Sequence, residues 1–270
     1  MQEGMAYVML GRPERKEDLY ITKDFDPSEI KCDEKYSLPE SKRLSQIFDD
    51  AEKAKKEHRD KNFKISYLNV RSMKAADGHR KDIALDNIIM NTDMFGLAET
   101  WLEQDQQVHF NGFNGYFANF GNGKGVAGYS KLDLTCQPET IYSNPYSAIL
   151  FKTCQFHIIF LYISSNYNKD DLFTLLDMWI EKDVATAIMG DVNENLGGMR
   201  IRPFMKKMCY FGFEQLIKNV TCDTGSTLDH IYVNDAMKLK GITTEIDAAY
   251  YSDHDIISLN IPKEEQNQSL

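Results

Sequence analysis

The sequence is organised around two segments, Ser226-Thr227-Leu228-Asp229-His230-Ile231-Tyr232-Val233 and Tyr251-Ser252-Asp253-His254-Asp255. The Ile-Tyr-Val run of the first predicts a β-strand, and the second is a polar turn before the apolar strand of residues 256–259. Each segment places an aspartate directly before a histidine. A carboxylate can hold an imidazole in one tautomer and favour its charged form, which suits the ring to a phosphate. The alternative is that both pairs are ordinary polar loop residues.

The composition indicates a globular protein. The chain has 270 residues, 42% hydrophobic and 27% charged, which is enough for one large domain and an additional segment. The net charge of −10 argues against a bulk electrostatic hold on nucleic acid, although acidic residues around a divalent cation can create a local positive site. No apolar run is long enough to span a membrane. Five cysteines without a metal-binding spacing, and no secretory leader, predict a nuclear or cytoplasmic protein.

The sequence divides into four predicted parts. Residues 1–36 open on a β-type run without a neighbouring strand. Residues 37–62 form a predicted amphipathic linker helix, with apolar side chains on one face and lysines on the other. Residues 63–262 form a compact domain, and residues 263–270 a polar tail.

Within the domain the hydrophobic pattern predicts many strands and few helices. Strands are expected at residues 64–70, 93–98, 115–131 (two strands), 147–164 (a hairpin turning near Cys154), 184–189, 229–233 and 256–259. Helices are expected around residues 83–89, 172–180 and 201–211. Adjacent hairpins with few helices indicate an α/β protein built from stacked sheets flanked by helices.

Polar side chains follow several of these strands, at the point where each strand ends. They are Asn69, Glu99, Tyr162, Asp191 and Asn193. Residues at strand ends are where a rigid scaffold displays functional groups. Carboxylate and amide oxygens, without a zinc-type spacing, favour Mg²⁺ or Mn²⁺. Because the sequence has no serine–histidine arrangement and no glycine–lysine phosphate loop, we infer metal-assisted attack of water on phosphorus.

Each of these residues also has a purely structural interpretation. Asn69 and Asn193 can be turn formers, and Glu99 can be an ordinary carboxylate at a strand end. Tyr162 can be a core aromatic whose hydroxyl needs only a hydrogen-bond partner. Asp191 is more specific, because a carboxylate directly after an apolar run is costly unless it is paired or metal-bound. The order in which all of them occur supports the functional interpretation.

A series of motifs in sequence order resembles the endonuclease/exonuclease/phosphatase superfamily, and within it the apurinic-endonuclease-like domains of mobile elements. The motifs are Leu68-Asn69-Val70-Arg71-Ser72, Ala98-Glu99-Thr100-Trp101-Leu102, Gly125-Val126-Ala127, Leu161-Tyr162, Met189-Gly190-Asp191-Val192-Asn193, Thr227-Leu228-Asp229-His230-Ile231 and Ser252-Asp253-His254-Asp255. The resemblance covers residues 63–262. It implies a four-layer α/β sandwich of two packed, mostly antiparallel sheets flanked by helices, with the site at one end.

The resemblance also implies a metal site. Glu99 would be the main ligand of Mg²⁺ or Mn²⁺, helped by Asn69 and Asp253. Arg71 stands where many apurinic endonucleases have an acidic residue, which argues against a second metal ligand there.

The catalytic roles that the resemblance implies fall on five residues. Asp191 would orient or deprotonate the attacking water, Asn193 would hold a phosphate oxygen, and Tyr162 would contact the scissile phosphate. Asp229 would orient His254, which would stabilise charge on the pentacoordinate phosphorus.

The first residues carry a second resemblance. The run Ala6-Tyr7-Val8-Met9-Leu10-Gly11-Arg12, followed by Asp18-Leu19-Tyr20-Ile21, is similar to the final motif of the helicases of Helitron transposons. Gly11 stands where that motif usually has serine. A helicase C-terminal remnant before such a nuclease domain resembles the Helentron branch of these elements.

We therefore expect a monomeric, metal-dependent DNA endonuclease of transposon origin. Ile163-Ser164-Ser165 replaces the Arg-Pro-Pro that usually follows the tyrosine in retrotransposon enzymes, and the domain is compact. Abasic specificity is therefore not expected. The alternatives are a phosphatase of the same fold acting on a small or lipid phosphoester, and a non-catalytic transposon remnant.

Overall fold

The computed structural model describes residues 61–73, 91–119, 124–143, 146–164, 170–197, 202–249 and 251–263, together with the single residues 53, 85 and 88. By its internal contacts the chain divides into two units, Met1–Asp60 and Lys61–Leu270, and the fold below is that of the second unit. The predicted helicase remnant lies outside the described residues. The same holds for nearly all of the linker helix, and for the tail after Lys263.

One sheet has six strands in the order β11-β12-β1-β2-β4-β3. The strands are β1 (Asn62–Asn69), β2 (Met94–Ala98), β3 (Phe113–Ala118), β4 (Val126–Lys131), β11 (Thr243–Asp247) and β12 (Ile256–Pro262). The neighbours β1 and β2 are parallel, and the other neighbouring pairs are antiparallel. The sheet has this one parallel pair because β1 and β2 are consecutive strands joined by a crossover connection. The other neighbouring strands are joined by a hairpin or come from distant parts of the chain.

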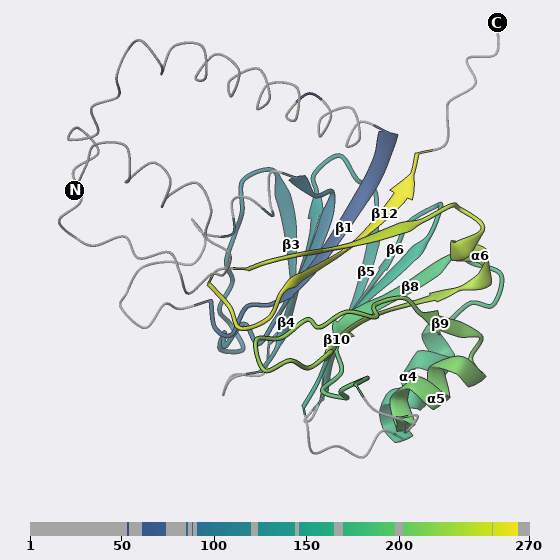
Figure 1. The fold of residues 1–270 in the computed structure, drawn as a ribbon. Coiled ribbons are helices and arrows are strands. Elements are labelled where there is room, and N and C mark those ends of the chain that lie inside the picture. Colours follow the sequence, from purple (N-terminus) through teal and green to yellow (C-terminus); the bar gives the residue numbers. More distant parts are fainter. Residues whose placement is uncertain are drawn as a thin grey trace, which may run out of the picture. The chain divides into compact units, whose positions relative to one another are not determined.

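The second sheet also has six strands, in the order β5-β6-β7-β8-β10-β9. They are β5 (Gln137–Ser143), β6 (Tyr146–Lys152), β7 (His157–Ile163), β8 (Thr186–Asp191), β9 (Phe213–Gln215) and β10 (Asp229–Asn234). Again the central pair, β7 and β8, is parallel and the others are antiparallel. Figure 1 shows strands of both sheets running across the domain.

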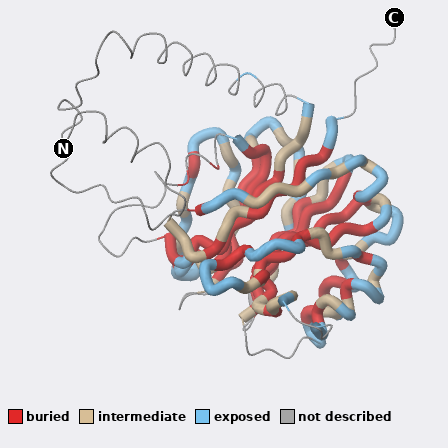
Figure 2. Tube along the Cα trace, viewed as in Figure 1, coloured by how far each residue is buried: buried red, intermediate tan, exposed pale blue. Residues whose placement is uncertain are grey.

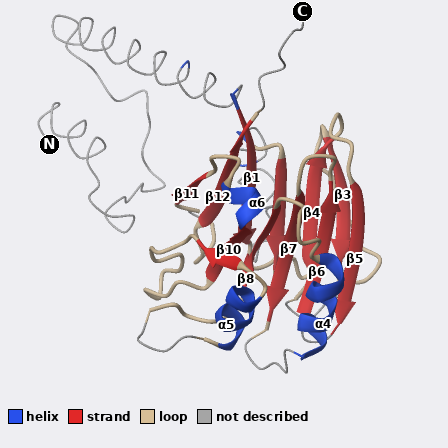
Figure 3. Cartoon of the chain, turned by 90° about the vertical axis from the view of Figure 1, so that its right-hand side faces the viewer, coloured by secondary structure: helices blue, strands red, loops and turns tan. Residues whose placement is uncertain are grey.

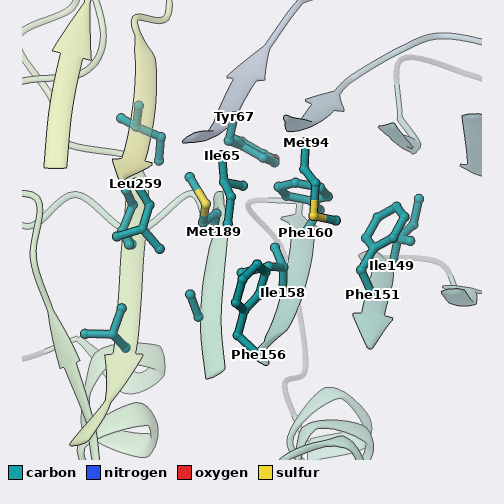
Figure 4. Packing of buried hydrophobic residues seen from close by; sticks show 14 of the residues in the cluster. Ile65, Tyr67, Met94, Ile149, Phe151, Phe156, Ile158, Phe160, Met189 and Leu259 are labelled. Carbon is teal, nitrogen blue, oxygen red and sulfur yellow. The ribbon is translucent and has the colours of Figure 1, made fainter. Parts of the chain in front are cut away.

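The alternation of side chains along the strands explains how the two sheets pack. On β7, Ile158 and Phe160 point into the space between the sheets, whereas Ile159 and Leu161 point to the outer face. Figure 4 shows the inner layer, where Tyr67 and Met94 from one sheet face Phe160 of the other. Burying such a side chain contributes about 1.5–3 kcal/mol, so this layer fixes the two sheets against each other.

Helices cover the outer face of the second sheet (Figure 3). They are α4 (Asp170–Trp179) and α5 (Pro203–Tyr210); a short helix, α6 (Asp235–Lys238), follows β10. Leu176 of α4 and Phe204 of α5 belong to the same apolar cluster as the outer side chains of β7. On the outer face of the first sheet, Leu85 and Ile88 pack with the aromatic side chains of β2 and β4. The predicted four-layer α/β sandwich of two packed, mostly antiparallel sheets is therefore confirmed.

Some elements differ from the sequence prediction. β5, β9, β11 and α6 were not predicted, whereas the hairpin of residues 147–164 turns between Lys152 and His157, as expected. β5 has a proline, Pro138, as its second residue, and both β5 and β11 lie at sheet edges. Edge strands tolerate proline and polar residues, so their sequences lack the apolar alternation of central strands. Figure 2 shows the contrast between buried central strands and more exposed connections.

The topology gathers the ends of the central strands at one edge, called the rim below. It consists of the last residues of β1, β2, β7 and β8 and the residues that precede or begin β10 and β12. Asn69 pairs with Ala98 across the parallel strands β1 and β2, and Tyr162 pairs with Asp191 across β7 and β8. Because β10 runs antiparallel to β8, its first residue, Asp229, also lies opposite Asp191.

Candidate active site

Three buried ionisable side chains meet at the rim. Asp191 ends β8, Asp229 begins β10 opposite to it, and His254 lies just before β12. Each offers an atom within 4.8 Å of those of the other two. Their exposed fractions are 1%, 0% and 7%. Their charges therefore interact with little screening by water.

Asp229 controls the charge of His254. Nδ1 of His254 lies 2.8 Å from Oδ2 of Asp229. Burial by itself lowers the pKa of the imidazole, but the hydrogen bond and the charge of Asp229, with that of Asp191, raise the pKa of His254 to about 10. His254 is therefore a cation at neutral pH, suited to stabilising negative charge on a phosphate oxygen.

Asp191 is a carboxyl group whose pKa lies close to neutrality. Burial and the neighbouring charge of Asp229 raise the pKa of Asp191 to about 7, against the opposing charge of His254. Hydrogen bonds also act against this rise: Asn69 Nδ2 donates to Oδ2 at 2.9 Å and the Asn193 amide to Oδ1 at 2.9 Å. A fixed carboxylate with this pKa can accept a proton from water at neutral pH.

Asn69 joins the two sheets at the rim. Its Oδ1 accepts a hydrogen bond from the Arg71 amide at 3.1 Å while its Nδ2 reaches Asp191 in the other sheet, which fixes the orientation of the side-chain amide. The Ser252 hydroxyl donates to the backbone oxygen of Asn69 at 2.6 Å and accepts from the His254 amide at 3.2 Å. The loop that carries His254 is thereby tied to the end of β1.

Glu99 reaches the same region through Tyr162. The Tyr162 hydroxyl donates to Glu99 Oε1 at 3.1 Å. Burial, followed by the charges of Glu99 and Asp191, raises the pKa of Tyr162 well above its ordinary value, so its hydroxyl stays protonated as a donor. Tyr162 lies on the inner face of β7 beside Asp191. The sheets thus bring Glu99, Tyr162 and Asp191 together although they are distant in sequence.

Asp253 has two different surroundings. Its Oδ2 lies 2.6 Å from Arg71 Nη1, in an ion pair that sequence reasoning did not anticipate. Its Oδ1 is buried and accepts no hydrogen bond within the described part of the chain. Asp253 also groups with Cys222 and His254 as a second set of atoms that lie within 4.8 Å of one another.

The donor set suits a hard divalent cation. Oδ1 of Asp229, like that of Asp253, is a buried carboxylate oxygen without a hydrogen-bond partner among the described residues. Leaving such an atom unpaired is costly, and a cation would satisfy it. A protonated His254 has no lone pair to offer a metal, so the candidates that remain beside it in the first cluster are the carboxylate oxygens of Asp191 and Asp229, the kind of ligand that Mg²⁺ and Mn²⁺ prefer. The ligand set Asn69, Glu99 and Asp253 stays a prediction.

The backbone is strained at the rim. Among the described residues, the non-glycine residues with positive φ follow β1, β2 or β8; they are Arg71, Ser72, Glu99, Trp101 and Asn193, at 48°, 85°, 48°, 57° and 50°. Such conformations persist where the surroundings hold them, and they cluster at functional sites. The Asn193 side chain donates to the backbone oxygen of Ile163 at 2.8 Å, and its predicted contact with a phosphate oxygen stays a prediction.

Sequence reasoning gave no role to three residues that position this site. The Tyr67 hydroxyl donates to the Leu161 backbone oxygen at 2.8 Å and accepts from the Asp191 amide at 3.1 Å. Thr221 Oγ1 accepts from the Asp229 amide at 3.1 Å, and Ser252 makes the contacts described above. Ser252 could have been found because it directly precedes Asp253 and His254. Tyr67 in an apolar strand and Thr221 in a loop carry no such signal.

A two-sheet sandwich with a buried Asp/His cluster at one rim defines a class of hydrolases. The chain belongs to the endonuclease/exonuclease/phosphatase family, because residues 67–254 match the Endonuclease/Exonuclease/phosphatase family. A comparison with curated protein sequences found no match. Among the described residues, no helix is long and apolar enough to cross a membrane.

Several solved structures share the fold. The endonuclease domain of TRAS1, a telomere-specific non-LTR retrotransposon, has a TM-score of 0.57 at 16% identity, covering 74% of this chain and 98% of that one. An AP endonuclease from Archaeoglobus fulgidus has a TM-score of 0.56 at 16% identity, with coverages of 74% and 99%. The AP endonuclease LMAP from Leishmania major has a TM-score of 0.59 at 12% identity, with coverages of 76% and 89%. At these identities the likeness is one of fold.

Proposed function

We propose that this protein is a metal-dependent phosphodiesterase that nicks DNA by in-line attack of an activated water. The observation that supports this best is the buried cluster in which Asp229 holds His254 as a cation beside Asp191, a carboxylate with a pKa of about 7. This places a proton acceptor and a fixed positive charge at one rim. Both would assist the attack of water on a phosphodiester, because one accepts the proton of water and the other stabilises the negative charge that develops.

In the proposed reaction the oxygen of water attacks phosphorus while Asp191 accepts its proton. The bond from phosphorus to the leaving oxygen breaks on the opposite side, and the leaving alkoxide takes a proton from solvent water. His254, and the hydroxyl of Tyr162, stabilise the negative charge on the non-bridging oxygens. Glu99, with Asn69, would hold Mg²⁺ or Mn²⁺, which when bound supplies Lewis-acid stabilisation of the phosphate. Asp253 would add its Oδ1 as a further ligand of the cation. Asn193 would hold a phosphate oxygen through its side-chain amide.

Three of the solved structures with this fold support a nucleic-acid substrate, which we take to be DNA. The retrotransposon protein and the two AP endonucleases with the same fold are all named as endonucleases. We also propose a transposon origin with a helicase remnant, which rests on the sequence resemblance of residues 6–21. We further propose that the enzyme is monomeric and nuclear or cytoplasmic.

A substrate panel tests this proposal. The purified chain, with Mg²⁺ and separately with EDTA, is incubated with supercoiled plasmid, single-stranded RNA, and small phosphoesters such as bis-p-nitrophenyl phosphate and a phosphoinositide. We expect magnesium-dependent conversion of supercoiled to open-circular plasmid and slower turnover of the other compounds. Faster hydrolysis of a small or lipid phosphoester would transfer the function to a phosphatase of the same fold. Inactivity on every substrate, with no stabilisation by Mg²⁺, would indicate a non-catalytic remnant.

A further inference from the structure

Trp101 has an unusual position for a tryptophan. Its exposed fraction is 46%, whereas the residues on either side, Thr100 and Leu102, are 0% and 3% exposed. Within the described part of the chain the indole makes no ring contact with another aromatic side chain. The protein's other tryptophan, Trp179, is the last residue of α4; it is 5% exposed and packs in the core.

The backbone holds Trp101 in this outward position. Its φ of 57° lies in the left-handed region, which is unfavourable for a residue with a bulky side chain. The Trp101 amide donates to the Lys124 oxygen at 3.3 Å, and the Met73 amide donates to the Thr100 oxygen at 2.9 Å. The loop is thus fixed on both sides, and the indole is presented in advance of any ligand. Such preorganisation reduces the entropic cost of binding.

Trp101 lies at the rim, two residues after Glu99. Within the described part of the chain, the other aromatic residue among the exposed large apolar side chains is Tyr210, which lies at the opposite end of the strands. It ends α5 and precedes β9, whose first residue Phe213 pairs with Asn234, the last residue of β10. The rim therefore combines the phosphate-directed groups with a single exposed indole.

We propose that Trp101 is a stacking platform for a nucleobase that flanks the cleaved phosphodiester. This inference rests on the proposed function and specifies its substrate class: a nucleic-acid strand with an accessible base, single-stranded or locally opened. Stacking of a base on an aromatic side chain contributes about 1–3 kcal/mol and does not depend on which base it is. For a chain with a net charge of −10, stacking would supply affinity that bulk electrostatics do not.

A lipid surface is the competing partner for an exposed tryptophan. Binding to a membrane surface usually requires several neighbouring apolar side chains. Of the other exposed large apolar side chains among the described residues, Leu132 and Leu239 follow β4 and α6, and so lie at the end of the strands away from the rim. Met178 lies on α4, over the outer face of the second sheet. Val220, in the loop between β9 and β10, is the remaining one on the rim side. This distribution favours one base over an extended lipid contact.

The first test uses the fluorescence of the indole. With EDTA present and at low salt, a single-stranded oligonucleotide is added to the protein while tryptophan is excited selectively. A second strand of the same length carries phosphates and sugars but no bases. We expect quenching by the oligonucleotide and little quenching by the base-free strand. Because Trp179 is buried, the response should vanish in Trp101→Phe.

The second test measures affinity by polarisation of a labelled oligonucleotide. Trp101→Ala should weaken binding by about 5- to 100-fold, as expected for the loss of one stacked base. Trp101→Phe, which keeps a ring, should retain most of the affinity. Trp101→Gly also removes the ring and suits the positive φ, so it separates loss of stacking from loss of folding. Tyr210→Ala removes an exposed ring away from the rim and should bind like the unmodified protein.

The outcomes separate this inference from the proposed function. Equal quenching by the base-free strand, or unchanged affinity in both Trp101→Ala and Trp101→Gly, would overturn the stacking role even if plasmid nicking is observed. A change in Trp101 emission with phosphatidylcholine–phosphatidylserine vesicles but not with the oligonucleotide would assign the indole to lipid. Base-dependent quenching without any nicking would leave the stacking site standing and remove only the proposed chemistry.

Discussion

At the scale of single residues, the site keeps charged groups where water cannot stabilise them. Asp191 is 1% exposed, and the partners that could compensate its charge, His254 and the amide of Asn69, do not fully do so. The raised pKa shows that the ionised form is less favourable in the folded protein than in water. A catalytic carboxylate commonly lowers the stability of the folded protein, because its charge must not be fully compensated by hydrogen bonds and ion pairs if it is to react.

Asp191→Asn should therefore stabilise the metal-free protein while abolishing its activity. The folded-state pKa of about 7 exceeds the ordinary value of 3.8, so ionisation costs stability as the pH rises through this window, and the full cost is present above it. Asparagine cannot ionise. We therefore compare the melting temperature of the variant with that of the unmodified protein at two pH values. The difference in favour of the variant should be larger at about pH 8 than at about pH 4, by about 2–4 °C or more. A difference that is the same at both pH values would contradict the assignment.

Asp229→Asn should change the pH dependence of activity. The carboxylate raises the pKa of His254 to about 10, whereas burial lowers it, so removing the charge should bring the pKa of His254 down. The stability that this pair contributes is fully present below the ordinary value of 6.5 and is lost as the pH rises through about 10. The alkaline limb of the nicking rate should move to lower pH in the variant. Asp235→Asn, at an exposed carboxylate on α6, should leave the profile unchanged.

At the scale of elements, the spacing between β7 and β8 sets the position of Asp191. A Cβ atom at Gly190 would clash with the backbone oxygen of Leu161, at a separation that real Cβ atoms do not show. Gly190 therefore lets the two parallel strands approach, so that Asp191 lies beside Tyr162.

Gly190→Ala should push these strands apart. We expect the free energy of unfolding, measured by urea denaturation, to fall by about 1–3 kcal/mol or more, with loss of nicking. Gly197→Ala, in the loop after β8, is a milder control: its Cβ would meet a side-chain oxygen of Asn195 at 3.2 Å, and a shift of that side chain by a few tenths of an ångström would relieve the contact. Equal stability of the two variants would show that the close approach is unimportant.

How much of these elements could be predicted depends on where each strand lies. β6, β7 and β8 are central and apolar, so their periodicity identified them. β5 and β11 are edge strands, and their polar sequences could not be distinguished from loops.

The candidate site divides in the same way. The polar residues at strand ends, such as Asp191, were visible in the sequence because an apolar run precedes them. Their partners were not: the hydrogen bond from Tyr162 to Glu99 and that from Asn69 to Asp191 each cross between two sheets. The ion pair of Arg71 with Asp253 depends on a loop with positive φ, which no local pattern indicates.

At the scale of the whole molecule, the two sheets form one site only when they are packed together. Asn69 and Glu99 come from the first sheet, and Tyr162, Asp191 and Asp229 from the second. The buried layer between the sheets, which includes Tyr67 and Phe160, fixes their relative position. A cation held at the rim should bridge loops from both sheets, so metal binding and the stability of the domain should be linked.

Glu99→Gln should weaken this linkage. We expect Mg²⁺ to raise the melting temperature of the unmodified protein and to raise that of Glu99→Gln less, since an amide is a weaker ligand than a carboxylate. Glu103→Gln, an exposed carboxylate in the same loop, is the matched control and should respond like the unmodified protein. Equal responses in all three proteins would remove Glu99 from the ligand set.

Magnesium-dependent nicking of supercoiled plasmid, compared among the unmodified protein, Glu99→Gln and Asp191→Asn, tests the convergence of these side chains most directly. We expect the unmodified protein to nick the plasmid with Mg²⁺ and not with EDTA. Each variant should be slower by about 100-fold or more while remaining folded. Nicking that persists in EDTA, or at an undiminished rate in both variants, would contradict a metal-dependent site built from both sheets.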